Sequence, residues 1–165
     1  MLGAADWLRA QGRQHVGVLG ASMGAASSLL AAAGDPSIEA LVADSAFCDF
    51  GMMIERQYRK LSRMPRCLLP GALALARLVT GVRIDAVCPV EAAASLQGRP
   101  LLVIHSEGDR FVPVDDARAL AKAARAELWI TPGSRHLGSY ATDPAAYAAR
   151  VTAFFRSALL PANAA

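Results

Sequence analysis

The chain has 165 residues, enough for one domain with a hydrophobic core and too few for two of comfortable size. Hydrophobic residues make up 54% and charged residues 19%, a composition typical of a globular protein. The formal net charge is only +3 and the sequence carries no recognised nucleic-acid-binding motif, which argues against nucleic acid as a partner.

Helical and strand patterns alternate through the first 44 residues. The apolar runs that we interpret as strands are continuous, as expected where both faces of a sheet are covered by helices. Glycine and proline punctuate the segments between them. The predicted elements are a helix over Leu2–Gln11, a strand over His15–Leu19, a helix over Ser22–Ala33 and a strand over Ile38–Ala43.

The segment 48–99 interrupts this alternation. It holds two helical patches, Met52–Leu61 and Ala72–Val79, which we expect Pro65 and Pro70 to separate. We predict a helical, cap-like insertion over the strand ends, where open α/β sheets bind their ligands. Its excess of arginine and lysine is interpreted as a solvated helical face, with attraction to anionic substrates or to a membrane surface as the alternative.

The alternation resumes after the insertion. The predicted elements are strands over Leu101–His105 and Glu127–Thr131 and helices over Val114–Ala124 and Pro144–Leu159, the last capped by Asp143. The tail 161–165 is expected to fray. The whole chain, 1–165, therefore predicts one α/β domain, built on a parallel sheet of about four strands flanked by helices.

Three further features of the sequence bear on the location of the protein and on whether it binds a metal or a cofactor. The most apolar stretch, Cys67–Val82, is interrupted by Pro70, Gly71 and Arg77, so a membrane span is not expected. No export signal is recognised at the N-terminus. The three cysteines show no metal-ligand spacing, and we expect no metal, no cofactor and a cytoplasmic location.

The stretch Gly20-Ala21-Ser22-Met23-Gly24 connects a predicted strand directly to a predicted helix. Such a turn holds its serine in a strained conformation, with the hydroxyl exposed at the helix N-terminus. We expect Gly20 and Gly24 to be small because strand and helix approach each other closely. The alternative interpretation is a tight turn that carries an ordinary serine.

A serine nucleophile requires a base, and the sequence offers three histidines. His15 opens the strand that leads to Ser22, at the end remote from it. His105 ends the third strand and is interpreted as a structural or supporting residue. His136 lies in the loop 132–138, at the same edge of the sheet as Ser22, and is the predicted base; an ordinary loop histidine is the alternative.

The histidine requires a carboxylate that fixes its tautomer. Asp109 follows the third strand, in a loop next to the strand that presents His136, and we favour it. Asp44, at the end of the second strand, is the alternative acid. Glu107 is expected to face solvent.

These motifs resemble those of the α/β-hydrolases, close to the serine-aminopeptidase-like and dienelactone-hydrolase-like branch. The resemblance rests on four segments. They are the strand–serine–helix turn at 20–25, called the elbow below, the stretch 43–47, the signature 100–113 and the loop 133–136. It implies that Ser22 is the nucleophile, Asp109 the acid and His136 the base. Ser106 stands where the family usually has glycine.

The resemblance covers the C-terminal part of that fold, so we expect an N-terminally incomplete domain. The Met23 amide is then the oxyanion-hole donor that this segment supplies. The strand His15–Leu19 would become an apolar sheet edge, which a second copy or another chain could cover.

The sequence thus predicts a serine hydrolase that cleaves a carboxylic ester, thioester or small amide of a small-molecule acyl substrate through an acyl-enzyme on Ser22. The alternative is a catalytically incomplete hydrolase fragment that serves as an interaction module. Haloalkane and epoxide hydrolases place an aspartate at the elbow, so Ser22 argues against them.

Overall fold

The computed structural model describes residues 1–62, 65–96 and 98–160. The chain divides into two compact units, Met1–Cys48 with Pro89–Ala165, and Asp49–Cys88. The expected fraying of 161–165 lies outside the described residues. The candidate site belongs to the first unit.

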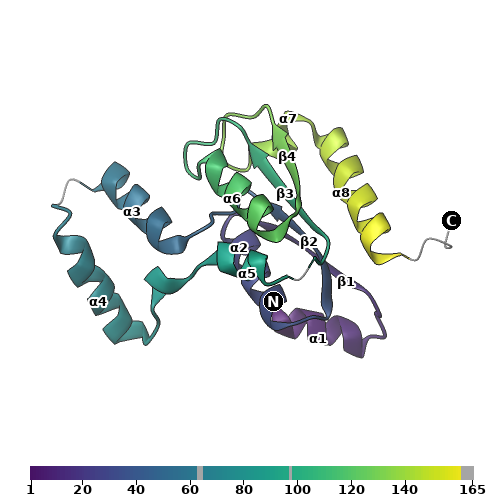
Figure 1. Ribbon diagram of the computed structural model, residues 1–165, viewed down its shortest axis with the longest axis horizontal. Coiled ribbons are helices and arrows are strands. Elements are labelled where there is room, and N and C mark those ends of the chain that lie inside the picture. Colours follow the sequence, from purple (N-terminus) through teal and green to yellow (C-terminus); the bar gives the residue numbers. More distant parts are fainter. Residues whose placement is uncertain (63–64, 97, 161–165) are drawn as a thin grey trace. The chain divides into compact units, whose positions relative to one another are not determined.

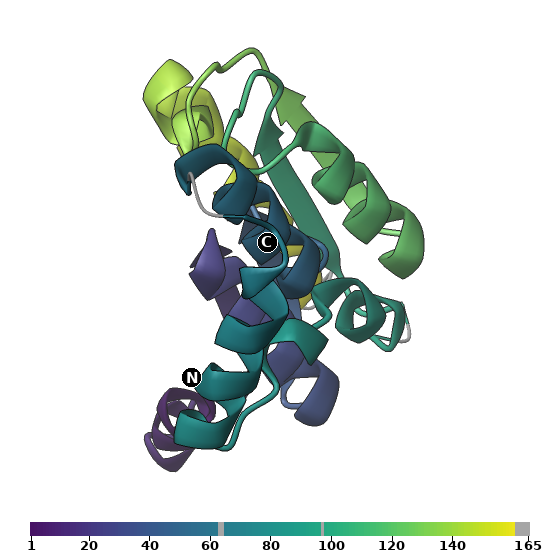
Figure 2. The same cartoon turned by 90° about the vertical axis from the view of Figure 1, so that its left-hand side faces the viewer.

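Within the described residues, four strands form one parallel sheet in the order β1-β2-β3-β4. They are β1 (Val16–Ala21), β2 (Ile38–Asp44), β3 (Leu101–Ser106) and β4 (Glu127–Thr131) (Figure 1). The arrowheads of β3 and β4 point the same way in Figure 2. The fold class is the predicted one, and parallel pairing brings the carboxyl ends of all four strands to one edge.

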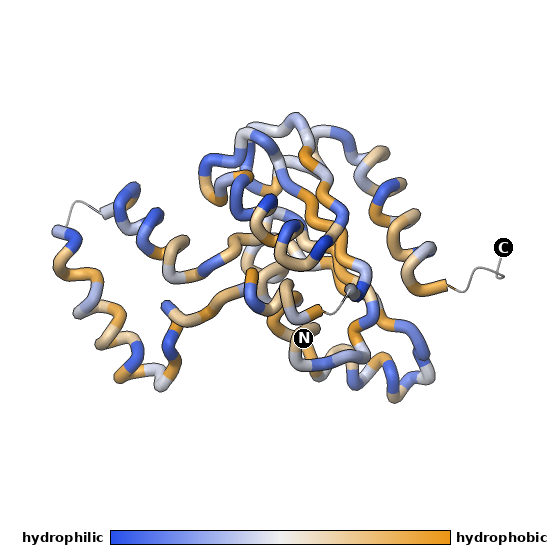
Figure 3. The backbone as a smooth tube through the Cα atoms, viewed as in Figure 1, coloured by the Kyte–Doolittle hydropathy of each residue, from blue (hydrophilic) through white to orange (hydrophobic). Residues whose placement is uncertain are grey.

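Helices cover both faces of this sheet. The larger core joins the sheet to α2 (Met23–Gly34), α5 (Pro89–Ala94) and α6 (Val114–Ala124), and also includes Ala5 of α1 (Leu2–Ala10). The smaller core lies against α8 (Pro144–Leu159). Alternate side chains of β3 enter different cores, Val103 the larger and Ile104 the smaller. Such burial on both faces explains the apolar strands, which are largely orange in Figure 3.

The predicted elements of the first unit are all present, and two short helices were missed. α6, β4 and α8 have the predicted bounds, while β1 and β2 each extend further toward the site than predicted. The missed helices are α5 and α7 (Gly138–Thr142). Both are too short to show a periodic hydrophobic pattern in the sequence.

The second unit contains α3 (Phe50–Leu61), α4 (Leu68–Thr80) and the 3-10 turn η1 (Ile84–Ala86). The Asp49 side chain caps α3 by accepting the Met52 amide at 2.8 Å. The expectation that Pro70 separates two helical patches is wrong, because α4 begins at Leu68. Pro70 lies in the first turn of α4, where backbone amides make no intrahelical hydrogen bond, so the missing amide hydrogen of proline costs nothing there.

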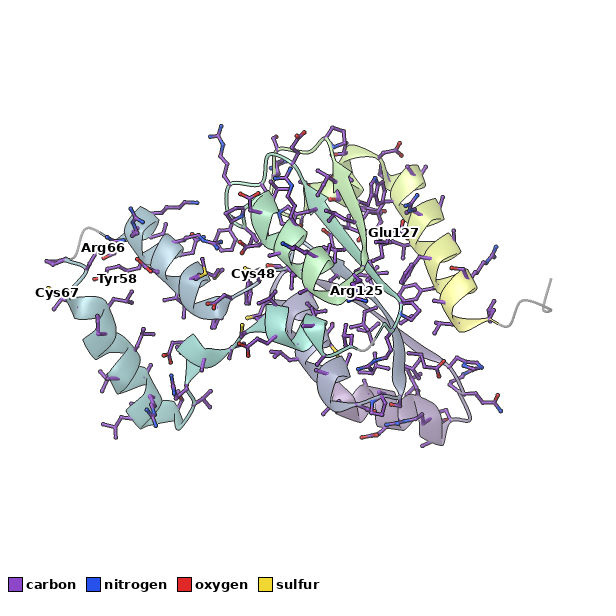
Figure 4. The ribbon with its side chains drawn as sticks, in the orientation of Figure 1. Cys48, Tyr58, Arg66, Cys67, Arg125 and Glu127 are labelled. Atoms are coloured by element: carbon purple, nitrogen blue, oxygen red, sulfur yellow. The ribbon has the colours of Figure 1, made fainter. Side chains whose placement is uncertain are left out.

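Side-chain hydrogen bonds connect α3 to the segment just before α4 within this unit; Tyr58 and Arg66 are labelled in Figure 4. The Tyr58 hydroxyl donates to the Pro65 carbonyl at 3.0 Å, and Arg66 donates to Glu55 at 2.8 Å. In neither unit does a helix of the described residues have the length and apolar character needed to cross a membrane.

Candidate active site

Ser22 stands between the end of β1 at Ala21 and the start of α2 at Met23. Its backbone has φ 52° and ψ −118°, a region that a residue with a side chain rarely adopts and that costs on the order of 1–3 kcal/mol. The Ser22 amide donates to the Asp44 carbonyl at 2.8 Å, which ties the turn to β2. The predicted strained turn is therefore present.

The two glycines of the elbow differ. A Cβ added to Gly20 would lie 2.6 Å from the Ala25 Cα and 2.5 Å from the Ser28 hydroxyl, so close approach requires glycine there. A Cβ on Gly24 would meet nothing within 4 Å. The expectation that close packing requires Gly24 is wrong, because this position is on the exposed side of the first turn of α2.

His136 lies between β4 and α7 and contacts both of the other predicted site residues. Its Nε2 is 2.7 Å from the Ser22 Oγ, and its Nδ1 is 2.7 Å from the Asp109 Oδ2. An ionised carboxylate only accepts hydrogen bonds, so Nδ1 carries the proton and Nε2 is free to accept the serine hydroxyl. The geometry is that of a nucleophile, a base and an orienting acid in series.

Asp109 is held in place from two sides. Its side chain is fully buried, and its Oδ1 accepts the amides of Phe111 at 2.8 Å and Val112 at 3.1 Å. Its Oδ2 faces His136. The carboxylate thus exchanges water for two backbone amides and an imidazole, so its oxygens have hydrogen-bond partners in a buried position.

His105 lies beside Asp109, and its hydrogen bond goes to the loop after this acid, whereas Ser22 pairs with His136. His105 is fully buried, its Nε2 donates to the Val112 carbonyl at 3.0 Å, and the same nitrogen is 3.6 Å from the Asp109 Oδ2. It supports the turn that carries the acid, which agrees with the structural interpretation. His15 is exposed at the other end of β1 and pairs with Glu39 at 2.9 Å.

The structure pairs His136 with Asp109, while Asp44 has other partners. The Asp44 carboxylate accepts the hydroxyls of Ser45 and Tyr147, each at 2.9 Å. Burial raises the pKa of Asp44 above its ordinary value of 3.8, and these two hydrogen bonds partly oppose the rise. Burial, followed by the neighbouring Asp44 charge, also raises the pKa of Tyr147. Asp44 therefore joins α8 to the end of β2.

This contact predicts a stability effect that depends on pH. Because the pKa of Asp44 is raised on folding, its contribution to stability is greatest below pH 3.8 and falls as pH rises through the raised value. Tyr147→Phe removes a donor from the ionised carboxylate and should lower the unfolding free energy by about 1–3 kcal/mol at pH 7. The loss should be smaller at pH 3.5, where Asp44 is mostly protonated.

Urea unfolding at the two pH values measures this difference. Tyr140→Phe is the matched control, since the Tyr140 side chain is 57% exposed, and it should change the unfolding free energy little at either pH. An equal loss at both pH values for Tyr147→Phe would show that the hydroxyl does not stabilise the ionised form of Asp44.

Buried hydroxyl groups support the loop that carries His136. The Thr131 hydroxyl donates to the Ser139 Oγ at 2.9 Å, which is 3.3 Å from the Ser106 Oγ. A Cβ on Gly133 would lie 2.7 Å from the Ser106 hydroxyl, so Ser106 fits because the loop above it has glycine. Sequence reasoning missed Thr131 and Ser139, which no local motif marks.

The Met23 amide occupies the first position of α2, where a helix offers amides without intrahelical acceptors. Together with the helix dipole, such an amide favours negative charge next to Ser22. No group of three or more histidine, cysteine or acidic side chains in the described residues could hold a metal ion.

No protein-family model matches the chain. The Bacillus subtilis protein YqkD, described as uncharacterized, is 31% identical over 147 residues, which cover 86% of this chain and 48% of that protein. The chain therefore spans about half the length of this curated relative.

Solved structures share the fold. The Pyrococcus furiosus esterase Pf2001 superposes with a TM-score of 0.71 at 22% identity, over 93% of this chain and 59% of that one. The Pyrococcus horikoshii acylaminoacyl peptidase gives 0.70 at 17% identity, over 99% and 28%. MGS-MChE2, an alpha/beta hydrolase enzyme from the metagenome of lagoon sediments of Mar Chica, Morocco, gives 0.63 at 17%, over 92% and 66%.

The chain has part of the α/β-hydrolase fold. The α/β-hydrolase fold of this chain thus agrees with the resemblance that the sequence motifs indicated.

Proposed function

We propose that this α/β-hydrolase chain is a serine hydrolase that cleaves a carboxylic ester, thioester or small amide. The observation that carries the proposal is the pair of 2.7 Å contacts from His136, to Ser22 on one side and to Asp109 on the other. A loop histidine without a catalytic role would not be expected to hydrogen-bond both to a strained serine and to a buried carboxylate.

In the proposed reaction, the Ser22 Oγ attacks the acyl carbon and its proton passes to the His136 Nε2. The tetrahedral intermediate collapses, the bond to the leaving group breaks, and the leaving group takes that proton. Water then attacks the acyl-enzyme, gives a proton to Nε2, and the free acid leaves as the proton returns to Ser22. Asp109 stabilises the imidazolium in both halves of the cycle.

The negative oxygen of each intermediate requires hydrogen-bond donors. The Met23 amide is the donor that we assign in this chain, because it follows the nucleophile at the N-terminus of α2. Each donor of such a site contributes about 10²–10³ in turnover. The turnover rate of this chain will therefore depend on how many donors bind the oxyanion.

Two further observations support the proposed substrate class and location. Structures with this fold include an esterase and an acylaminoacyl peptidase, so ester and amide bonds are both candidates. Within the described part of the chain, the three cysteines form no disulfide. Cysteines without a disulfide fit the cytoplasmic location that we propose.

Hydrolysis of p-nitrophenyl esters of increasing chain length tests the proposal. The chain should hydrolyse the acetate and butyrate esters, and Ser22→Ala should abolish turnover. Ser27→Ala, an exposed serine in the same helix, is the matched control and should leave turnover unchanged. Equal turnover by Ser22→Ala and the unaltered chain would contradict the proposal.

A catalytically incomplete fragment that serves as an interaction module is the second candidate. One observation favours it: β1 is an edge strand in the described sheet. An unpaired edge strand is a template for pairing with another chain, so we propose a second copy or a partner chain there. Folded protein that turns over no ester would support this candidate.

A further inference from the structure

Phe111 contacts both the acid and the base of the candidate site. Its backbone amide donates to the Asp109 Oδ1 at 2.8 Å. Its ring lies against the His136 imidazole, with the ring centroids 4.9 Å apart and the planes tilted by 51°. One residue therefore touches two members of the series Ser22–His136–Asp109.

The backbone at Phe111 is held firmly. The next residue, Val112, is fully buried and donates its own amide to Asp109. The Val112 carbonyl accepts the buried His105 Nε2 at 3.0 Å. Because Val112 is buried and fixed by these two hydrogen bonds, the Phe111 ring is presented to His136 from a turn that has little freedom.

The contact has a consequence for charge. In the proposed reaction His136 becomes an imidazolium when it takes the Ser22 proton. A cation over the face of an aromatic ring, within about 6 Å of its centroid, is attracted by about 0.5–2 kcal/mol depending on exposure. The 4.9 Å between the ring centroids is within this range. The same ring limits rotation of the imidazole away from the hydroxyl.

We propose that Phe111 is a positioning residue, whose ring holds His136 against Ser22 and stabilises the imidazolium that forms during acyl transfer. The inference rests on the proposed function. It assigns to Phe111 a role that requires an aromatic face, beyond filling space. The residue is 38% exposed, so a ring-bearing replacement can be accommodated there.

Two substitutions at Phe111 distinguish the effect of its aromatic ring from the effect of its apolar volume. Phe111→Leu keeps apolar bulk and removes the ring, while Phe111→Tyr keeps the ring. Phe111→Leu should lower kcat for p-nitrophenyl butyrate about 2- to 30-fold, the fold-change that corresponds to the attraction above, and should change KM less than about twofold. Phe111→Tyr should retain kcat within about twofold of the unaltered chain.

Phe154→Leu is the matched control. Phe154 packs edge-on against Phe155 in α8, with centroids 5.5 Å apart, so its loss should affect stability and leave kcat unchanged. If Phe111→Leu keeps the full kcat, or if Phe111→Tyr loses as much as Phe111→Leu, the proposed role of the ring is wrong.

Proton NMR of the His136 ring gives a readout that does not depend on turnover. The Phe111 ring current should displace the His136 ring-proton signals in the unaltered chain and in Phe111→Tyr, and the displacement should disappear in Phe111→Leu. Unchanged signals in Phe111→Leu would overturn the inference. A folded chain without esterase activity that still shows the displacement would instead contradict the proposed function, and with it the role in acyl transfer.

Discussion

His136→Gln should lower kcat/KM for a p-nitrophenyl ester by about 10⁶-fold, the order of the loss when a serine hydrolase loses its histidine. Glutamine can hydrogen-bond to Ser22 and Asp109, which are each 2.7 Å from the imidazole, but cannot take a proton near neutral pH. The loss should appear in kcat, because the histidine acts in the transition state. Steady-state kinetics at pH 7–8 measure it.

His15→Gln is the control for this substitution. His15 is exposed and pairs with Glu39 at the start of β1, remote from Ser22, so its replacement should change kcat/KM less than about twofold. If His136→Gln retained a tenth or more of the activity, another group would be the base.

Asp109→Asn should lower kcat by about 10⁴-fold through a change of tautomer. The asparagine oxygen can still accept the amides of Phe111 and Val112, which leaves its NH₂ group facing the His136 Nδ1. That nitrogen must then accept, so the proton moves to Nε2 and the imidazole can no longer take the proton of Ser22. Circular dichroism should show a folded protein, since both backbone hydrogen bonds persist.

Asp44→Asn separates the two carboxylates that the sequence leaves as candidates. Ser45 and Tyr147 donate to different oxygens of Asp44, so one hydroxyl can still donate to the asparagine oxygen while the other can accept from its NH₂ group. His136 pairs with Asp109 instead. We expect a loss of less than about tenfold in kcat. A larger loss for Asp44→Asn than for Asp109→Asn would reverse the assignment of the acid.

The sequence predicted the parallel sheet well because its strands are buried on both faces and read as continuous apolar runs. It also named Ser22, Asp109 and His136, which the structure brings within hydrogen-bond distance. Each follows a strand, and parallel strands end at one edge, so local signals were enough to place all three together.

Features that depend on tertiary contacts were not visible in the sequence. The hydrogen bond from Tyr147 to Asp44 joins residues 103 positions apart, and the ring contact of Phe111 with His136 has no local motif. The requirement for Gly20 is a close contact, whereas the same argument failed at Gly24, which faces open space. The two glycines of this motif therefore differ in their surroundings, and only Gly20 is required by close packing.

Labelling with a fluorophosphonate tests the central claim most directly, because the probe requires an activated serine and no particular substrate. The intact mass of the folded chain should increase by one adduct, peptide mapping should place the adduct on Ser22, and Ser22→Ala should remain unlabelled while Ser27→Ala is labelled normally. An absence of labelling on folded protein, or an adduct that persists in Ser22→Ala, would contradict the claim that Ser22, His136 and Asp109 form a working nucleophile.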